Sequence, residues 1–386
     1  MVGTTEDVRR ANLAATLGIL YRQGPVSRAG LSKRTGRNRS TIASLVADLA
    51  ELGLVVESEP GSIGQVGRPS PVVSVRADVA AIAVNPEIDV LTIGLVGLDG
   101  GVRRVIRHEY DRIPTAAEVL SITAAVLAGM RLELDGLRGA GIGGAVPGQG
   151  RTHDGVVRNA PHLDWHDEPF AEPLAEATGF PVRVANDAAL GALAEHEFGA
   201  GRGKSHLVYV NGGASGIGGG VITAGHLLGG ASGYAGELGH VRVSGSPAAD
   251  SAGISGTLEA EVTRAELLEA LGLARAEPDQ FEAALLADRS PRVADVVARQ
   301  LGHLGTAIAG AINVFNPQMV ALGGFLAALQ AYDPALLAQA VSRSTLAPSL
   351  EGVTITAAEL GSNLLMVGAA GLAFGPLLAD PASISR

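Results

Sequence analysis

Residues 24–56 have the sequence Gly-Pro-Val-Ser-Arg-Ala-Gly-Leu-Ser-Lys-Arg-Thr-Gly-Arg-Asn-Arg-Ser-Thr-Ile-Ala-Ser-Leu-Val-Ala-Asp-Leu-Ala-Glu-Leu-Gly-Leu-Val-Val. Ser27 is a suitable N-cap for a short helix, and Gly36 supplies a tight turn after it. Three apolar residues then recur at helical spacing in a second helix with a basic start. The pattern predicts a helix-turn-helix whose second helix enters the DNA major groove. The alternative is a small helical interaction domain.

The segment after these helices predicts a wing. Apolar runs at 54–57 and 72–75 predict two short strands, and the tip between them carries Arg68 between a glycine and a proline. An arginine on such a slim, extended backbone fits an A·T-rich minor groove. Alternatively, the loop is flexible and Arg68 contacts only phosphate. The predicted DNA-contacting residues are Ser27, Arg28, Arg37, Asn38, Arg39, Ser40, Thr41, Ser44 and Arg68.

Composition and charge divide the chain into two parts. Its 386 residues are 47% hydrophobic, which suits about two or three domains with full cores. Residues 1–77 hold ten Lys and Arg against six Asp and Glu, a charge of +4, and the rest carries −14 for a total of −10. A basic module on an acidic body suits a DNA-binding head joined to a ligand-binding domain, although ordinary surface charge would also explain it.

Other compositional features narrow the class of protein. Cysteine is absent, which excludes disulfides and thiolate metal sites. The N-terminus lacks the basic and apolar regions of a signal peptide. No uninterrupted apolar run reaches membrane-spanning length by inspection. We therefore expect a cytoplasmic protein with no membrane partner.

The remaining chain alternates strands with helices, which predicts an α/β domain. Polar residues and glycines follow several predicted strands, where open sheets bind ligands. The predicted elements are a hairpin at 80–105, helices at 115–134, 188–198, 258–273, 278–287, 293–315 and 361–378, and strands at 139–146, 182–185, 205–210, 221–223 and 319–324.

Several motifs together resemble the ROK family (repressors, open reading frames and sugar kinases), in its winged-helix repressor branch. The motifs beside the helix-turn-helix and wing are Ala145-Val-Pro-Gly148, Asn159-Ala-Pro-His-Leu-Asp-Trp165, Val184-Ala-Asn-Asp187, Gly216-Ile-Gly-Gly-Gly220, Gly233-Tyr-Ala-Gly-Glu-Leu-Gly-His240, Gly256-Thr-Leu-Glu259 and Phe315-Asn-Pro-Gln-Met-Val-Ala-Leu-Gly-Gly324. The resemblance covers nearly the whole chain. It implies an actin-like, two-lobed fold with a sugar in the cleft.

The resemblance also implies a set of sugar contacts. The base that takes a proton from the sugar hydroxyl in family kinases corresponds to Asp187, and Asn186 would bond a neighbouring hydroxyl. Carboxylates and imidazole suit the paired hydroxyls of a pyranose. The alternative treats the two later glutamates as solvated surface acids and the histidine as structural. The expected ligand-binding residues are Asn186, Asp187, Glu237, His240, Glu259 and Gly148.

The phosphate loop of family kinases is altered in this chain. The family has an Asp-x-Gly-x-Thr type loop, and the matching stretch here is Asn85-Pro-Glu-Ile-Asp89. Glu87 and Asp89 replace the glycine and the hydroxyl, so their charges oppose ATP phosphate, and Pro86 removes an amide donor. The glycine loop at 212–220 remains but is a weak signal by itself. We expect no phosphoryl transfer, with Asp187 a vestigial base.

The chain also lacks the cysteines that hold the structural zinc of the family. The family holds it with a histidine and a Cys-x-Cys-Gly-x-x-Gly-Cys motif, whose cysteines correspond to Asp250, Ala252 and Thr257. His240, even together with Asp250, does not make a zinc site. We therefore expect no metal and no cofactor. The loop at 241–258 lacks its family anchor, and its small, polar residues predict mobility without ligand.

These features predict an α/β protein of two domains. A winged helix-turn-helix at 1–77 precedes a two-lobed, actin-like ATPase (ribonuclease H-like) sugar-kinase fold at 78–386. Lobe one is expected at about 78–198 plus 360–386 and lobe two at about 199–359.

The expected function is a sugar-responsive transcriptional regulator, a repressor of carbohydrate metabolism genes. Its expected partners are a double-stranded DNA operator, a sugar or sugar phosphate, and a second copy in a homodimer or dimer of dimers, because two-fold dimers match two half-sites. The alternative is an active hexose kinase that also binds DNA. A third possibility is a regulator that has lost sugar sensing.

Overall fold

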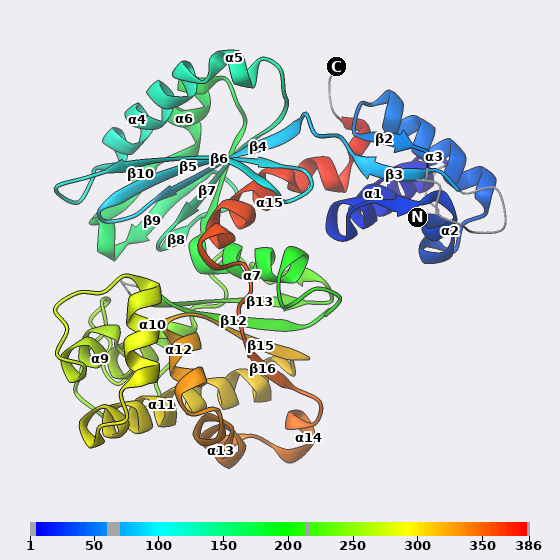
Figure 1. The fold of residues 1–386 in the computed structure, drawn as a ribbon. Helices are drawn as coiled ribbons and strands as arrows, with labels where there is room; N and C mark the ends of the chain where they lie inside the picture. Colours follow the sequence, from blue (N-terminus) through cyan, green and yellow to red (C-terminus); the bar gives the residue numbers. More distant parts are fainter. Residues whose placement is uncertain (1–4, 60–69, 214–215, 384–386) are drawn as a thin grey trace.

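The computed structural model describes residues 5–59, 70–213 and 216–383. It has two α/β lobes, one above the other, and a small helical head beside the upper lobe (Figure 1). The predicted α/β class and two-lobed, actin-like architecture are confirmed. Each lobe is built on a five-stranded sheet.

The head has the predicted helix-turn-helix arrangement with one additional short strand. Its elements are α1 (Thr5–Gln23), β1 (Val26–Ser27), α2 (Arg28–Thr35), α3 (Arg39–Glu51), β2 (Val55–Ser58) and β3 (Val72–Val75). Ser27 caps α2 by accepting a hydrogen bond from the Gly30 amide at 3.1 Å, and Gly36 ends that helix in the left-handed region at φ 68°. The strands pair antiparallel in the order β1-β3-β2. The predicted wing tip at Arg68 lies outside the described residues.

Lobe one carries the first five-stranded sheet, in the order β11-β7-β4-β5-β6. Its elements are β4 (Val79–Pro86), β5 (Val90–Gly97), β6 (Val102–Glu109), α4 (Ala116–Gly129), α5 (Arg131–Leu134), β7 (Arg138–Val146), β8 (Gln149–Gly150), β9 (Val156–Ala160), η1 (Pro161–Leu163), β10 (Trp165–Pro169), α6 (Ala171–Thr178) and β11 (Val182–Asn186). Strands β8 to β10 form a separate small sheet.

Lobe two carries the second sheet, in the order β14-β13-β12-β15-β16. Its elements are β12 (Leu207–Gly212), β13 (Ile217–Thr223), β14 (His226–Leu227), η2 (Leu238–His240), α8 (Leu258–Glu261), α9 (Arg264–Ala270), α10 (Pro278–Ala287), α11 (Pro291–Phe315), β15 (Met319–Gly324), α12 (Phe325–Tyr332), α13 (Pro334–Ser344), α14 (Ala347–Leu350) and β16 (Thr354–Ala357). Both sheets have one topology: an antiparallel meander whose first strand also pairs in parallel with a fourth, which pairs in parallel with a fifth.

Two helices lie between the sheets. Helix α7 (Asp187–Phe198) packs on β12 and β13 of lobe two, whereas α15 (Leu364–Ala379) packs on β4 and β7 of lobe one. The two helices also pack against each other. Short turns η3 (Gly361–Asn363) and η4 (Pro381–Ser383) flank α15. Helix α15 then continues to the head (Figure 1).

The head shares a hydrophobic core with lobe one. Leu17 and Leu20 of α1 belong to the same buried cluster as Ala369 and Phe374 of α15. The hydroxyl of Tyr21 in α1 donates a buried hydrogen bond of 2.7 Å to Glu197 in α7. The head is therefore packed against the body rather than tethered to it by a linker alone.

Three sequence predictions were wrong in detail. The single helix expected at 115–134 is divided into α4, which ends at Gly129, and the short α5. The single helix expected at 258–273 is divided into α8 and α9, because Val262 and Thr263 are extended and Thr263 caps the second helix. The segment Gly361–Ala379 is long and apolar enough to cross a membrane, whereas no apolar run of that length was expected from the sequence. In this structure its helix packs between the lobes, so an interior position accounts for its apolar character.

Candidate functional site

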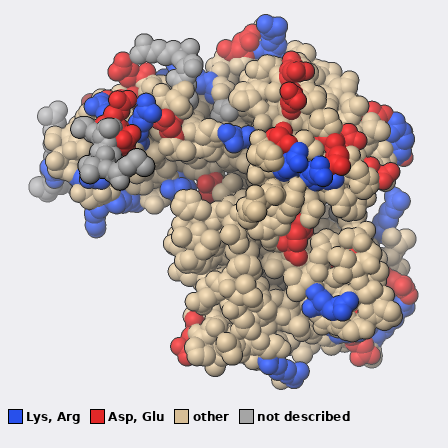
Figure 2. Space-filling view, turned by 180° about the vertical axis from the view of Figure 1, so that it is seen from behind, with Lys and Arg blue, Asp and Glu red and all other residues tan. Residues whose placement is uncertain are grey.

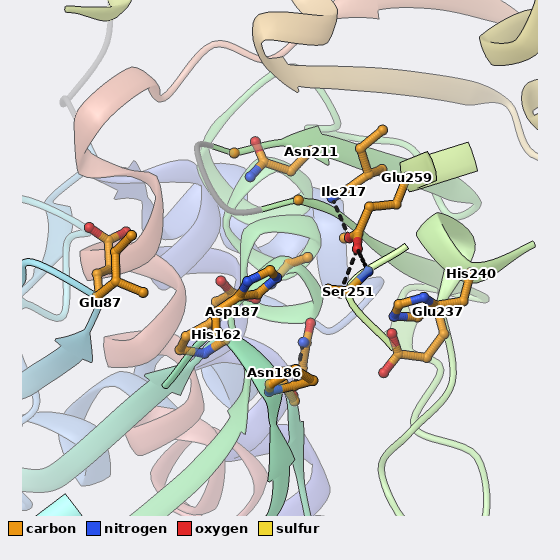
Figure 3. Close-up of a pocket in the computed structure, with 18 of the residues that line it drawn as sticks. Glu87, His162, Asn186, Asp187, Asn211, Ile217, Glu237, His240, Ser251 and Glu259 are labelled. Carbon is orange, nitrogen blue, oxygen red and sulfur yellow. Dashed lines mark hydrogen bonds between the residues drawn. The ribbon is translucent and has the colours of Figure 1, made fainter. Parts of the chain in front are cut away.

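A cleft between the lobes gathers all six of the predicted ligand-binding residues. Its cavity of about 200 Å³ suits a small ligand, since drug-sized ligands use roughly 300–1,000 Å³. The ends of β7, β11 and β12 meet there with the turn between β4 and β5 (Figure 3). The polar lining residues are Glu87, Asp89, His162, Asn186, Asp187, Asn211, Glu237, His240, Ser251 and Glu259.

Asn186 and Asp187 enter the cleft at the start of α7. The Asn186 side chain caps this helix by accepting from the Ala189 amide at 2.9 Å, and its Nδ2 donates to the Gly148 carbonyl at 3.0 Å. Gly148 has φ 133°, and a Cβ there would lie 2.4 Å from a backbone oxygen. A glycine is therefore needed where residue 148 approaches Asn159 and Ala160 of β9, and its carbonyl oxygen binds Asn186.

Asp187 is the carboxylate with the most strongly perturbed acidity in the cleft. Burial raises its pKa to about 7, and the charges of Glu87 and Glu237 act in the same direction, although the Ala188 amide opposes them. That amide donates to Asp187 at 2.7 Å. A carboxylate with a pKa near neutrality can exchange a proton with a ligand hydroxyl.

Three further predicted contacts come from lobe two. Glu237 and His240 belong to the turn at η2, and Glu259 lies in α8 (Figure 3). Burial raises the pKa of Glu237. Glu259 accepts from the Ile217 amide at 3.0 Å and from the amide and hydroxyl of Ser251 at 3.0 and 2.5 Å. The lobes thus place acceptors on both sides of the cavity.

The altered phosphate loop faces the same cavity. Asn85 is buried and donates to the Ala145 carbonyl at 3.1 Å, so it joins β4 to β7 instead of lining the cleft. Glu87 and Asp89 do line it, and burial followed by the charge of Asp89 raises the pKa of Glu87. The lining, within the described ranges, contains no Lys or Arg. This lining disfavours a phosphate group.

The glycine-rich segment has a packing role in β13. A Cβ on Gly220 would lie 2.9 Å from the Ala189 Cα and 2.6 Å from the Ala192 Cβ, both in α7. A Cβ on Gly219 would lie 2.7 Å from the Gly236 carbonyl oxygen. Glycine is therefore required where α7 and the Glu237 segment approach the strand.

The residues at the family's zinc position do not fit that ion. His240 Nδ1 lies 2.8 Å from Asp250 Oδ2, whereas ligand atoms bound tetrahedrally to zinc lie about 3.3 Å apart, given bonds near 2 Å. Thr257 donates its hydroxyl to the same carboxylate oxygen at 2.9 Å. No group of three or more His, Asp or Glu able to hold a metal occurs among the described residues.

Six of the nine predicted DNA-contacting residues lie around the start of α3. Arg37, Asn38, Arg39, Ser40 and Ser44 are exposed, and Thr41 is half-buried. The Asn38 side-chain oxygen caps α3 by accepting from the Thr41 amide at 2.8 Å.

Arg28 differs from this exposed group because its side chain is already paired within the head. Its guanidinium forms a bidentate ion pair with Glu57 of β2, and Ser27 uses its hydroxyl as a helix cap. Figure 2 shows basic side chains over the head, intermixed with acidic ones. The exposed cations at 37 and 39 are therefore better placed for an external ligand than Arg28.

Sequence reasoning missed several cleft residues. His162 lies in the 159–165 motif, and Asn211 lies near the end of the buried strand β12, so the sequence around both residues could have indicated them. Nothing in the sequence indicated Ser251, because its position depends on how its loop folds back to Glu259.

The sequence profile of the ROK family matches residues 90–375. The chain is similar to the putative xylose repressor of Caldicellulosiruptor sp. (strain Rt8B.4), with 26% identity over 97% of this chain and 98% of that protein. It is 34% identical to the glucokinase of Thermotoga maritima over 60% of this chain and 78% of that protein. A crystallised ROK family transcriptional regulator, a homologue of the E. coli MLC protein, superposes with a TM-score of 0.78 at 25% identity, over 96% of this chain and 97% of that one. The chain belongs to the ROK family.

Proposed function

We propose that this chain is a sugar-responsive DNA-binding repressor without kinase activity. The single observation that carries the proposal is a helix-turn-helix head that shares a core with the lobe bearing the sugar-type cleft. Similarity over nearly the full length to a putative xylose repressor supports the same function.

The effector we propose is an uncharged sugar rather than a sugar phosphate. Five carboxylates line the cleft, at Glu87, Asp89, Asp187, Glu237 and Glu259, and the described lining has no Lys or Arg to balance them. Carboxylates accept hydrogen bonds from sugar hydroxyls, whereas they repel phosphate. Of the two effectors expected from the sequence, a sugar and a sugar phosphate, we therefore propose the sugar.

The proposed signal passes along α7. This helix starts at Asp187 in the cleft and ends at Glu197 and Phe198, against Tyr21 of the head. Helix α15 runs beside it, with Leu365 at the cleft and Phe374 next to Tyr21. A sugar that favours one lobe closure would move the head with lobe one and change the spacing of two heads in a dimer. The sugar can shift this equilibrium only by its difference in affinity for the two states.

Operator binding in the presence of sugars tests the proposal. Fluorescence anisotropy of operator DNA, titrated with the full chain, should show a shift in affinity with glucose or xylose and none with their phosphates. Linkage requires that the operator change the affinity for the sugar by the same factor. An operator affinity unchanged by any sugar would refute sugar sensing, and a response to the phosphates alone would refute the proposed effector class.

The second candidate function is an active hexose kinase. Its support is the Asn186-Asp187 pair and the near-neutral pKa of Asp187, which suits a general base. ATP-dependent phosphorylation of glucose that disappears in Asp187→Asn would establish this activity. We expect no phosphorylation above background, because Glu87 and Asp89 occupy the side of the cleft that a phosphate would need.

A further inference from the structure

We propose that Asp250 is a positioning residue of the sugar site, which orients His240 and anchors the loop 241–258 without a metal ion. This inference rests on the proposed sugar binding in the cleft. It concerns how the site is held together in a chain that lacks the family's cysteines.

The Asp250 side chain is a buried hydrogen-bonding centre. Its exposed fraction is 0%, and both carboxylate oxygens are used. Oδ2 faces His240 Nδ1 at 2.8 Å and accepts from the Thr257 hydroxyl at 2.9 Å. Oδ1 accepts from the amides of Ala252 and Ile254, each at 2.9 Å. A buried carboxylate with four donors is held firmly, and each donor is fixed in return.

One consequence concerns the two nitrogens of the His240 ring. Because Asp250 is an acceptor, Nδ1 carries the proton in the bond between them. Nε2 is then the ring nitrogen available to a ligand, and His240 lies on the cavity wall (Figure 3). A carboxylate behind an imidazole fixes both the tautomer and the ring orientation, as it does for histidines that bind metals.

A second consequence concerns Glu259. Thr257, held by Asp250, is also the N-cap of α8, the helix that carries Glu259. Ser251, the residue after Asp250, donates its amide and hydroxyl to Glu259 Oε1. The carboxylate of Asp250 thus ties together the loop, the histidine and the second glutamate of the site. Two of the three contacts from lobe two depend on it.

The experiment measures sugar binding with and without metal. Glucose and xylose are titrated by calorimetry into the full wild-type chain before and after EDTA treatment, with zinc content measured by mass spectrometry. We expect equal affinities and no stoichiometric zinc. Asp250→Ala should weaken sugar binding by about tenfold or more, as loss of a group that orients a ligand residue does. Asp250→Asn, which keeps one acceptor oxygen, should have a sugar affinity between those of the wild type and Asp250→Ala. The matched control is Asp279→Ala, at an exposed position in α10.

Two readouts separate positioning from simple stability. The ¹⁵N spectrum of the wild-type chain should show His240 with a protonated, hydrogen-bonded Nδ1, and this measurement stands even if Asp250→Ala does not fold. In a double-mutant cycle, Asp250→Ala should cost much less affinity in a His240→Ala background, because the two residues act together.

The outcomes distinguish this inference from the function on which it rests. If the wild-type chain binds neither sugar, both the proposed sugar sensing and the role of Asp250 are refuted. If the chain binds sugar but EDTA abolishes binding, or Asp250→Ala binds like the wild type, the role of Asp250 is overturned while sugar sensing stands. A His240 protonated only at Nε2 would also overturn it.

Discussion

Tyr21 and Glu197 form the buried polar contact between head and body. Glu197 is 8% exposed, and burial raises its pKa to about 7, although the Tyr21 hydrogen bond and the charge of Arg22 oppose that shift. The carboxyl group is therefore easier to keep in the folded protein when it is protonated. Its burial therefore explains why stability should depend on pH at this junction.

Glu197→Gln should remove this dependence. With a folded pKa above the ordinary 4.5, Glu197 binds a proton more tightly in the folded state, so its contribution is greatest below pH 4.5 and is lost as the pH rises to about 7. Relative to Glu197→Gln, the wild type should lose up to about 3 kcal/mol of unfolding free energy over that window. Urea unfolding at several pH values measures this difference, and parallel pH profiles would contradict it.

Tyr21→Phe tests the proposed transmission to the head. The substitution keeps the ring between Phe198 and Phe374 but removes the hydroxyl that binds Glu197. We expect unchanged sugar affinity and a smaller effect of sugar on operator affinity, measured by calorimetry and anisotropy. Tyr332→Phe, in α12 of lobe two, is the control. If both variants retain the full sugar effect, this contact does not carry the signal.

Helix α7 depends on glycines in the strand beneath it. Gly220→Ala would place a Cβ within 3 Å of Ala189 and Ala192, and α7 would have to move. Overpacking of this kind costs about 1–3 kcal/mol, and the displaced helix start should weaken sugar binding. Thermal unfolding and calorimetry measure the two effects.

Gly302→Ala in α11 is the matched control for that substitution. Its Cβ would meet no atom within 4 Å, so helix propensity should raise stability by up to about 1 kcal/mol with no change in sugar affinity. Equal behaviour of the two alanine variants would show that β13 tolerates a side chain beside α7.

A buried carboxylate accepts hydrogen bonds from the chain segments that connect the two lobes. Glu195 of α7 is fully buried and accepts from the Ala200 amide at 2.8 Å and from the Glu359 and Leu360 amides at 3.0 and 2.9 Å. These amides lie where the chain leaves lobe one and where it returns. Glu195 therefore joins the two chain segments that connect the lobes.

At the scale of the whole molecule, a basic head is joined to an acidic body. The head carries +4 and the rest −14, so DNA contact is favoured only through the head. The exposed start of α3 is its best-placed basic surface, since Arg28 is paired with Glu57.

Arg39→Ala should weaken operator binding and reduce the salt dependence of the logarithm of affinity by about 1, as expected for one phosphate contact. Arg275→Ala, on the exposed surface of lobe two, should leave both unchanged. Anisotropy titrations over a range of salt concentrations provide the measurement. An unchanged slope for Arg39→Ala would remove this residue from the DNA interface.

Local interactions explain which features could be predicted from the residues alone. The predicted cap at Ser27 and the turn at Gly36 depend on near neighbours in the chain, whereas the cap at Asn38 was not predicted. The Asn186-Asp187 pair was assigned through the resemblance to the ROK family, and it lies where a strand ends and a helix begins. Such local features can be predicted without knowledge of the tertiary fold.

The fold alone decided the long-range pairs. Asp187 meets the charge of Glu87 only because β4 and β11 both flank β7, and Tyr21 meets Glu197 only because α15 and α7 pack beneath the head. The bond between His240 and Asp250 depends on a loop that closes on itself, which spacing does not specify. Residue types indicate what chemistry a side chain can perform, but partners distant in the chain are set by packing, which acts over the complete topology.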